Sequence, residues 1–368
     1  MTESSYNLDM PRGLLERGLR FLTSYLSAEP SYLILFATAR CNARCPHCFY
    51  RREIDAADAK TELTLAELER IASSLPKLLY LSVGGGEPFL RDDLPDIVRA
   101  FHERSGILIC SIVTNGFYTD RVESLAKTVL ERCPDLRLKI QVSIDDFGPD
   151  HDARRGVPGI HARAMETLRR LRALPAAHGR LQVDIGTCLT RSNLERAPAL
   201  VDDLRLRVDF DDHQILYPRG SAADPGEKEV PVDAYEALLR RAAERDPERS
   251  RLLTAVNSVA REGVLRFLKT GAQPWPCLAG RKFISITERG VLQPCEVLKG
   301  LRPDFSSDIA DLRACGLDVR AALASPKGRE VAAFVRDTRC RCSFECAANC
   351  NVLFSFKEAL RVGRALLP

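Results

Sequence analysis

The sequence lacks several features that mark membrane, secreted or nucleic-acid-binding proteins. No apolar run approaches the roughly 20 residues that a membrane span needs, and the longest one near the start, 32–39, has the length of a strand. Acidic and basic residues interrupt the N-terminus, so it has no signal-peptide pattern. A net charge of +4 is small for 368 residues and does not indicate nucleic-acid binding. These absences predict a cytoplasmic protein.

Cysteine, in contrast, is abundant, with thirteen residues that gather mostly near the two ends of the chain. In a cytoplasmic protein such clusters indicate metal binding rather than disulfides. Three cysteines stand alone, and each is predicted to be a small buried apolar residue: Cys110, Cys133 and Cys188. The composition, 45% hydrophobic and 28% charged, is that of a globular protein with ample material for a core.

Apolar runs and amphipathic stretches alternate through the first 220 residues. Strands are predicted at 32–38, 78–83, 107–113, 136–144, 181–189 and 208–217. Helices are predicted near 64–75, 94–104, 118–132, 160–174 and 193–204, the first opened by the capping-box pattern Thr64-x-x-Glu67. Six strands, each followed by a helix or crossover, indicate a parallel α/β architecture. They occupy less chain than the about 250 residues of an eight-stranded barrel.

Three closely spaced thiols, Cys41, Cys45 and Cys48, follow the first predicted strand. Thiolates are soft ligands that favour iron–sulfur clusters, zinc or copper(I). An iron–sulfur cube usually has four cysteine ligands, so three thiols leave one iron open to another ligand. A structural zinc site is the alternative for these residues taken alone.

The pattern C-x3-C-x2-C after an apolar strand resembles the signature of the radical S-adenosylmethionine (SAM) enzymes. The resemblance implies that SAM binds the open iron through its amino and carboxylate groups. It also implies that an electron from the cluster cleaves SAM, giving a 5′-deoxyadenosyl radical that abstracts a hydrogen atom from the substrate. The fold implied is a partial (β/α)6 barrel of TIM type, and the predicted strand count agrees with it.

Motifs at later strand ends resemble the SAM-binding elements of that family. Gly84-Gly85-Gly86-Glu87-Pro88 resembles the segment that contacts the SAM amino group, although Gly and Pro also punctuate ordinary turns. A Ser-x-Asp stretch followed by His-Asp-x-x-Arg-Gly resembles a subgroup with C-terminal clusters; helix caps and solvated charges are the alternative. The implied cofactor-binding residues are Gly85, Gly86, Glu87, Pro88, Asn115, Ser143 and Arg155.

The sixth predicted strand carries two further expectations. The stretch Tyr217-Pro218-Arg219-Gly220 at its end is placed near the adenine edge by the resemblance. His213, in the middle of that strand, is predicted to be a core histidine with its hydrogen bonds satisfied rather than a catalyst.

The C-terminal cysteines form a second pattern. Cys277, Gly290 and Cys295 match the opening of the SPASM and twitch domains, which bind auxiliary [4Fe–4S] clusters. The following spacings are shorter than the full SPASM pattern, and two complete cubes would need about eight cysteines. We therefore expect one auxiliary cluster, with a zinc ribbon as the alternative. Its ligands would be Cys277, Cys295 and two of Cys340, Cys342 and Cys346, with Cys350 ranked lower.

The fold class is thus α/β, a partial barrel with a small cysteine-rich α+β domain. The expected divisions are a lead-in helix at 1–30, the barrel core at 31–220 and a helical linker at 221–272. An auxiliary-cluster domain at 273–350 and a terminal helix at 351–368 follow. The terminal helix is expected to pack on that domain.

The resemblance predicts an enzyme with a SAM-binding [4Fe–4S] cluster, SAM and at least one auxiliary [4Fe–4S] cluster that assists electron transfer or substrate binding. The residues before the first strand are too few for the peptide-binding domain of many peptide-modifying members. We therefore expect a small-molecule substrate, such as a sugar or natural-product intermediate, and a flavodoxin or ferredoxin as reductant. The alternatives are a ribosomal-peptide maturase that forms C–C or C–S bonds or epimerises, and a non-catalytic iron–sulfur or zinc protein.

Overall fold

The computed structural model describes residues 12–174, 179–243, 251–338 and 340–355, with the pairs 357–358 and 361–362. Its strands form one sheet in the order β6-β5-β4-β3-β2-β1-β7-β8-β9. Neighbours from β1 to β6 are parallel, which confirms the predicted architecture. The strands are β1 (Tyr32–Thr38), β2 (Tyr80–Gly85), β3 (Ile109–Thr114), β4 (Arg137–Ser143), β5 (Leu181–Cys188), β6 (Asp212–Leu216), β7 (Phe283–Ile286), β8 (Val291–Gln293) and β9 (Ala310–Asp311).

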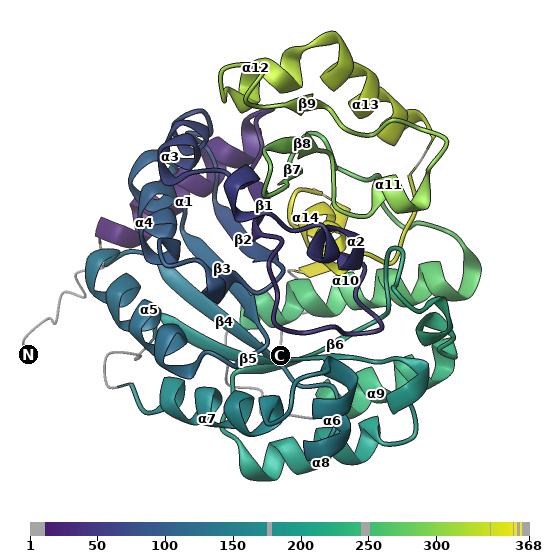
Figure 1. Ribbon diagram of the computed structural model, residues 1–368. Helices are drawn as coiled ribbons and strands as arrows, with labels where there is room; N and C mark the ends of the chain where they lie inside the picture. Colours follow the sequence, from purple (N-terminus) through teal and green to yellow (C-terminus); the bar gives the residue numbers. More distant parts are fainter. Residues whose placement is uncertain are drawn as a thin grey trace, which may run out of the picture.

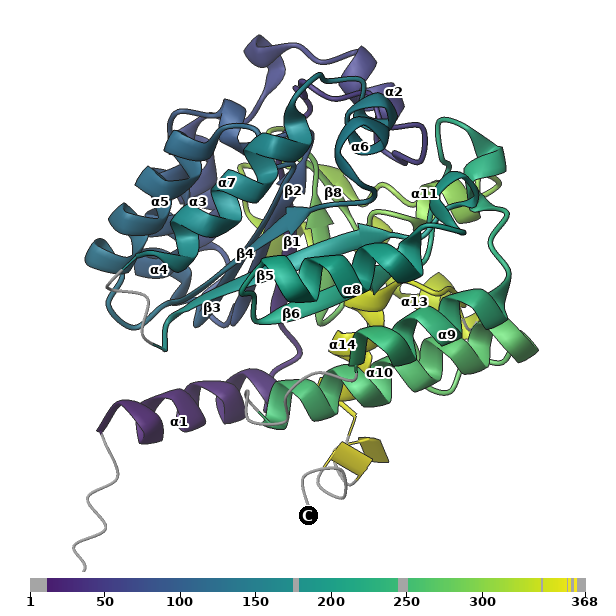
Figure 2. The same cartoon turned by 90° about the horizontal axis from the view of Figure 1, so that it is seen from below.

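Helices cover the outer face of the parallel strands, as Figures 1 and 2 show. They are α3 (Leu65–Ser73), α4 (Leu94–Ser105), α5 (Thr119–Arg132), α7 (Ile160–Arg172) and α8 (Ala197–Arg207). Each overlaps a predicted helix, and α1 (Arg12–Leu26) occupies the predicted lead-in position. Two helices follow β6, namely α9 (Val232–Ala243) and α10 (Arg251–Thr270). No helix in the described part of the chain is both long and apolar enough to cross a membrane.

The two faces of the sheet differ in polarity. On β4, Leu138, Ile140 and Val142 belong to the main hydrophobic core with the helices. Lys139 alternates with them, and its Nζ lies 2.6 Å from the fully buried carboxylate of Asp184 on β5. Because side chains alternate along a strand, the face opposite the helices carries polar groups at β4 and β5, whereas Ile34 and Phe36 make it apolar at β1.

Two element boundaries differ from the sequence-based prediction. The helix predicted at 193–204 begins later, at Ala197, because Thr190 and Asn193 cap a separate 3₁₀ turn before it. The helix predicted at 351–368 overlaps a helix that begins earlier, at Glu345, and ends at Leu353, and residues 357–358 and 361–362 are helical as well. An acidic residue in the first turn suits the start at Glu345. Residues 356, 359–360 and 363–368 of that prediction lie outside the described residues.

The cysteine-rich segment continues the barrel sheet. Strand β7 pairs in parallel with β1, placing Phe283 opposite Tyr32, and β8 and β9 extend the sheet antiparallel. Ile284 and Leu292 pack in the same core as the barrel strands. The helices of this segment are α11 (Leu298–Leu301), α12 (Val319–Ala324), α13 (Pro326–Asp337) and α14 (Glu345–Leu353). A domain division near residue 273 remains a prediction.

The predicted capping box forms, and it also ties α3 to the C-terminal segment. Glu67 accepts the backbone N–H of Thr64 at 2.8 Å, and Arg313 Nε donates to Glu67 at 2.6 Å. This guanidinium lowers the pKa of Glu67 to about 2. Glu67→Gln keeps the cap but loses the ion pair, so we expect a loss of about 1 kcal/mol, since Arg313 is partly solvated. Anaerobic thermal unfolding checks this, with exposed Glu330→Gln as the control.

Candidate active site

The carboxyl ends of neighbouring parallel strands meet at one edge of the sheet, where α/β barrels place their active sites. Here they surround a cavity of about 110 Å³. Nine of the residues predicted from the sequence line it: Cys41, Cys45, Cys48, Gly85, Gly86, Glu87, Asn115, Ser143 and Arg155. Pro88 does not line the cavity; it is buried and opens the short 3₁₀ turn Pro88–Leu90 beside it.

Gly85 and Gly86 let the end of β2 pack against the start of the thiol loop. Gly85 has a φ of 115°, and the N–H of Gly86 donates to the carbonyl of Thr38 at 2.8 Å. A Cβ on Gly86 would lie 2.1 Å from the carbonyl oxygen of Arg40. Only glycine permits so close an approach of two backbone segments.

The Glu87 side chain links the ends of β2 and β3. It is 1% exposed, and its carboxylate accepts the Thr114 hydroxyl at 2.7 Å and the Asn115 N–H at 2.8 Å. The Phe89 N–H lies 3.3 Å from the same carboxylate. Burial raises the pKa of Glu87 to about 7 in spite of these donors. Both carboxylate oxygens are thus engaged by the protein, so this side chain shapes the cavity wall.

Arg155 comes from the end of α6 (Gly148–Arg155) and forms a buried ion pair below the thiols. Its Nη2 lies 2.6 Å from Asp145 Oδ2, and its carbonyl accepts the N–H of Arg44 in the thiol loop. Burial opposes ionisation of Asp145, but Arg155 outweighs it and holds the pKa of that carboxyl well below its usual range. Within the described residues, the buried Nε of Arg155 has no hydrogen-bond partner.

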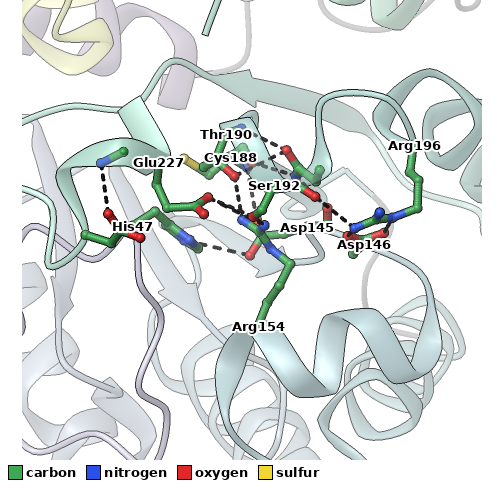
Figure 3. A network of polar contacts seen from close by, with 12 residues as sticks. His47, Asp145, Asp146, Arg154, Cys188, Thr190, Ser192, Arg196 and Glu227 are labelled. Carbon is green, nitrogen blue, oxygen red and sulfur yellow. Dashed lines mark hydrogen bonds and ion pairs between the residues drawn. The ribbon is translucent and has the colours of Figure 1, made fainter. Parts of the chain in front are cut away.

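Sequence reasoning missed two residues that pack around the thiol loop. His47 faces Asp145 (Figure 3), with 3.8 Å between Nε2 and Oδ2, which is too long for a hydrogen bond. Burial lowers the pKa of His47 to about 4, which keeps its ring neutral. Asn42 accepts a hydrogen bond from the Asn115 amide at 2.8 Å. Their positions between the motif cysteines were the only available signal.

The segment predicted as a linker after residue 220 is anchored to the same loop. The N–H of Asp224 donates to the carbonyl of Pro46 at 2.7 Å. Glu227 accepts the Ser192 hydroxyl at 2.8 Å and lies 3.6 Å from Arg154 of α6 (Figure 3). The start of this segment is therefore fixed against the thiol loop and α6, a contact that its sequence did not indicate.

Two expectations concern the last strand of the barrel. His213 is buried, and its Nε2 lies 2.8 Å from the Thr187 hydroxyl, in agreement with a satisfied core histidine. Arg219, in the stretch 217–220, lies 3.2 Å from Glu296 and 3.3 Å from Glu345 of the cysteine-rich segment, and the place of that stretch near the adenine stays a prediction. Arg219 does not line the cavity that contains the first three thiols.

Six C-terminal thiols share one hydrophobic cluster: Cys277, Cys295, Cys340, Cys342, Cys346 and Cys350. A hydrogen bond with the Cys340 thiol lowers the pKa of Cys277 to about 7. Cys295 and Cys342 are close enough to Cys277 to interact with it electrostatically. The structure thus brings together Cys277, Cys295 and two of the three remaining predicted ligands.

The other two thiols of this group lie one helical turn apart on α14. Cys346 hydrogen-bonds the Tyr32 hydroxyl, whereas Cys350 is fully buried and interacts with both Cys277 and Cys346. The i, i+4 spacing places both on one face of the helix. Spacing alone ranked Cys350 low, but its burial beside Cys277 makes it a further candidate. Cys315 stands apart, with its thiol 3.1 Å from the carbonyl of Asp311.

The donor set fits an iron–sulfur cluster with a cofactor on its open side. Burial raises the pKa of Cys41 to about 11 and that of Cys48 to about 12, so metal binding must displace their protons. Among the described residues, no three His, Cys, Asp or Glu side chains converge on one point as ligands of a single ion do. In a cube each thiolate binds a different iron, so its ligands surround a cavity. The unpaired Arg155 Nε adds a donor for an anionic group.

Comparisons with known proteins agree with this site. Residues 35–196 match the family model described as the radical SAM superfamily. The PqqA peptide cyclase of Xanthomonas euvesicatoria is 27% identical over 299 residues, covering 76% of this chain and 72% of that protein. The PqqA peptide cyclase of Rhodopseudomonas palustris is 27% identical over 295 residues, covering 76% and 70%.

Two solved structures share the fold. SuiB of Streptococcus suis, bound to S-adenosylmethionine, has a TM-score of 0.59 at 16% identity, covering 87% of this chain and 72% of that chain. The protein anSMEcpe with bound AdoMet has a TM-score of 0.56 at 16% identity, covering 92% and 95%. The match over residues 35–196 identifies a radical SAM enzyme with a [4Fe–4S] cluster and SAM as cofactors, and the chain has the fold of SuiB and anSMEcpe.

Proposed function

We propose that this radical SAM enzyme modifies a peptide substrate. The observation that supports this most is the similarity to PqqA peptide cyclases, which covers 76% of the chain. That share is larger than the barrel match alone, so the likeness includes residues outside 35–196. The sequence alone favoured a small molecule; the comparisons favour the alternative, a peptide maturase.

We assign roles to the cavity residues on this basis. Cys41, Cys45 and Cys48 would hold the reducing cluster, and the backbone of Gly85 and Gly86, which lines the same cavity, would bind SAM. The bound cofactors supply the radical that abstracts a hydrogen atom from the substrate. The remaining residues that we assign to SAM binding are Glu87, Pro88, Asn115, Ser143 and Arg155.

The protein groups around this cavity define its charge and shape. Arg155 brings a permanent positive charge that suits the SAM carboxylate, and Asp145 holds its guanidinium in place. Glu87 keeps the ends of β2 and β3 together, and its burial leaves little room for water beside it. We propose that a flavodoxin or ferredoxin delivers the electron.

The test is anaerobic reconstitution with iron and sulfide, followed by SAM, dithionite and the short peptides encoded beside the gene. We expect 5′-deoxyadenosine together with a mass change in one peptide. Conversion of a small metabolite with no peptide altered would overturn the proposal. Release of 5′-deoxyadenosine without SAM-dependent change in any peptide would count against it as well.

We propose that Cys277, Cys295, Cys340 and Cys342 hold an auxiliary [4Fe–4S] cluster, with Cys346 and Cys350 as alternative ligands. Cys342→Ala is then expected to remove up to about four irons per chain, the content of one cube. Cys315→Ala is the matched control, because this thiol lies apart from the others, and it should keep the full iron content. Iron analysis and the visible absorption of the reconstituted variants check the expectation. Equal iron loss in both variants would rule out this ligand set.

A further inference from the structure

A second and larger cleft adjoins the cofactor cavity. It has a volume of about 930 Å³. Its walls are α2 (Arg51–Asp55) with the residues around it, the loop 220–225, and the segment from the β7–β8 hairpin to α11, all visible in Figure 1. Pockets that enclose a drug-sized ligand span roughly 300–1,000 Å³, so this cleft is at the upper end of that range. A single sugar ring would leave most of it open.

Arg51 is the one residue that lines both the cleft and the cofactor cavity among the residues described. Asp55 accepts its Nε at 2.9 Å, and the carbonyl of Arg44 accepts its Nη1 at 3.4 Å. Within the described part of the chain, no hydrogen bond engages its Nη2. The guanidinium is therefore fixed at the junction of the two spaces with one donor group available.

The charges in the cleft are largely paired within its own walls. Lys299 lies 3.0 Å from Asp308, and Arg289 lies 3.4 Å from Glu288. Because both signs occur and neutralise each other, the walls do not select one strongly charged group such as a phosphate. Aromatic rings add apolar surface, among them Phe49. Such a surface suits a chain that presents amide groups and mixed side chains.

The cleft also comes near the C-terminal thiols. Glu296, which lines it, follows Cys295 directly, and its side chain is 4% exposed. A molecule bound in the cleft would therefore lie between the first three thiols and the C-terminal thiols. This position allows one residue of an extended segment to face the cofactor cavity at Arg51.

We propose that this cleft receives the substrate as an extended peptide segment and that Arg51 binds a backbone carbonyl or carboxylate of that segment. The bond would hold the reacting residue at the mouth of the cofactor cavity. An arginine suits this task because its planar fork of donors stays charged and oriented. The inference rests on the proposed peptide substrate and adds where that peptide binds and which side chain positions it.

The first experiment measures binding without turnover. Holoenzyme with SAM, but no reductant, is used to enrich binders from a library of displayed random twelve-residue peptides. Ala56, which is exposed in the cleft wall, is replaced by tryptophan to fill the cleft. Ala66→Trp, at an exposed position on α3, is the matched control. We expect enriched peptides to bind the wild type and Ala66→Trp equally, and Ala56→Trp at least roughly 10-fold more weakly.

The second experiment adds reductant and an enriched peptide. It compares the amount of peptide product formed per 5′-deoxyadenosine between the wild type and two variants. Loss of a charge-assisted hydrogen bond predicts a roughly 10-fold or larger fall in this ratio for Arg51→Gln, with a higher KM. Asp55→Asn removes the ion pair but leaves the guanidinium, so its fall should stay under roughly 3-fold.

The outcomes separate the two proposals. If no peptide is enriched on the wild type, the peptide substrate itself is refuted, and the cleft assignment with it. If enriched peptides bind Ala56→Trp as tightly as the wild type, the peptide function stands and the cleft assignment is wrong. If the product formed per 5′-deoxyadenosine fell equally in Arg51→Gln and Asp55→Asn, Arg51 would act only by stabilising α2.

Discussion

Gly86→Ala is expected to destabilise the protein by about 3 kcal/mol or more and to abolish 5′-deoxyadenosine formation. The added Cβ would lie 2.1 Å from the Arg40 carbonyl oxygen and 2.7 Å from that of Ala39. Both are backbone atoms at the start of the thiol loop, so no side-chain rotation relieves the overlap. The loop must move away from β2, which separates the first three thiols from the glycine wall. Anaerobic thermal unfolding and a SAM-cleavage assay measure the two effects.

Gly84→Ala is the matched control, two residues earlier in the same motif. An ideal Cβ on Gly84 meets no heavy atom within 4 Å, and its φ lies outside the left-handed region. Replacing such a glycine should change the stability by less than about 1 kcal/mol. If the two alanine variants were equally stable, the close packing of β2 on the thiol loop would be refuted as the reason for glycine at position 86.

The barrel was predictable because each parallel strand is a short apolar run followed by an amphipathic helix. Residues at strand ends, such as Cys41, Asn115 and Ser143, could then be expected at one edge without any knowledge of their contacts. Arg155 was harder, since it reaches the cavity only because α6 ends there. Its partner Asp145 lies in the Ser-x-Asp motif, but the ion pair between Asp145 and Arg155 is a tertiary contact that the spacing of the motif does not predict.

The contacts of the C-terminal segment were harder to predict from the sequence, because they too are tertiary contacts. The pairing of β7 with β1 joins parts of the chain far apart in sequence, and its register depends on side-chain packing of the two strands. Cys350 reaches Cys277 only through the docking of α14. Asp224 and Glu227 lie in the predicted linker, yet their bonds to the thiol loop and to Ser192 fix that segment against the barrel.

The second large effect is expected at Asp145, which is 1% exposed. Asp145→Asn keeps the shape of the side chain but removes the charge that neutralises Arg155, itself 6% exposed. A buried guanidinium without a counter-charge costs about 3–5 kcal/mol. Arg155 must then leave its position under the first three thiols, so SAM binding should weaken along with stability. Anaerobic thermal unfolding and calorimetric SAM titration of the reconstituted variant check both.

The neighbouring residue offers a control with the same chemistry and a different partner. Asp146 is also fully buried, and it pairs with Arg196 (Figure 3). The side chain of Arg196, however, is 43% exposed. After Asp146→Asn the guanidinium of Arg196 can turn to water, so the loss should be about 1–2 kcal/mol, with SAM affinity kept. Equal losses of stability in Asp145→Asn and Asp146→Asn would contradict this explanation. They would mean that the burial of Arg155 adds no cost beyond the loss of an ordinary ion pair.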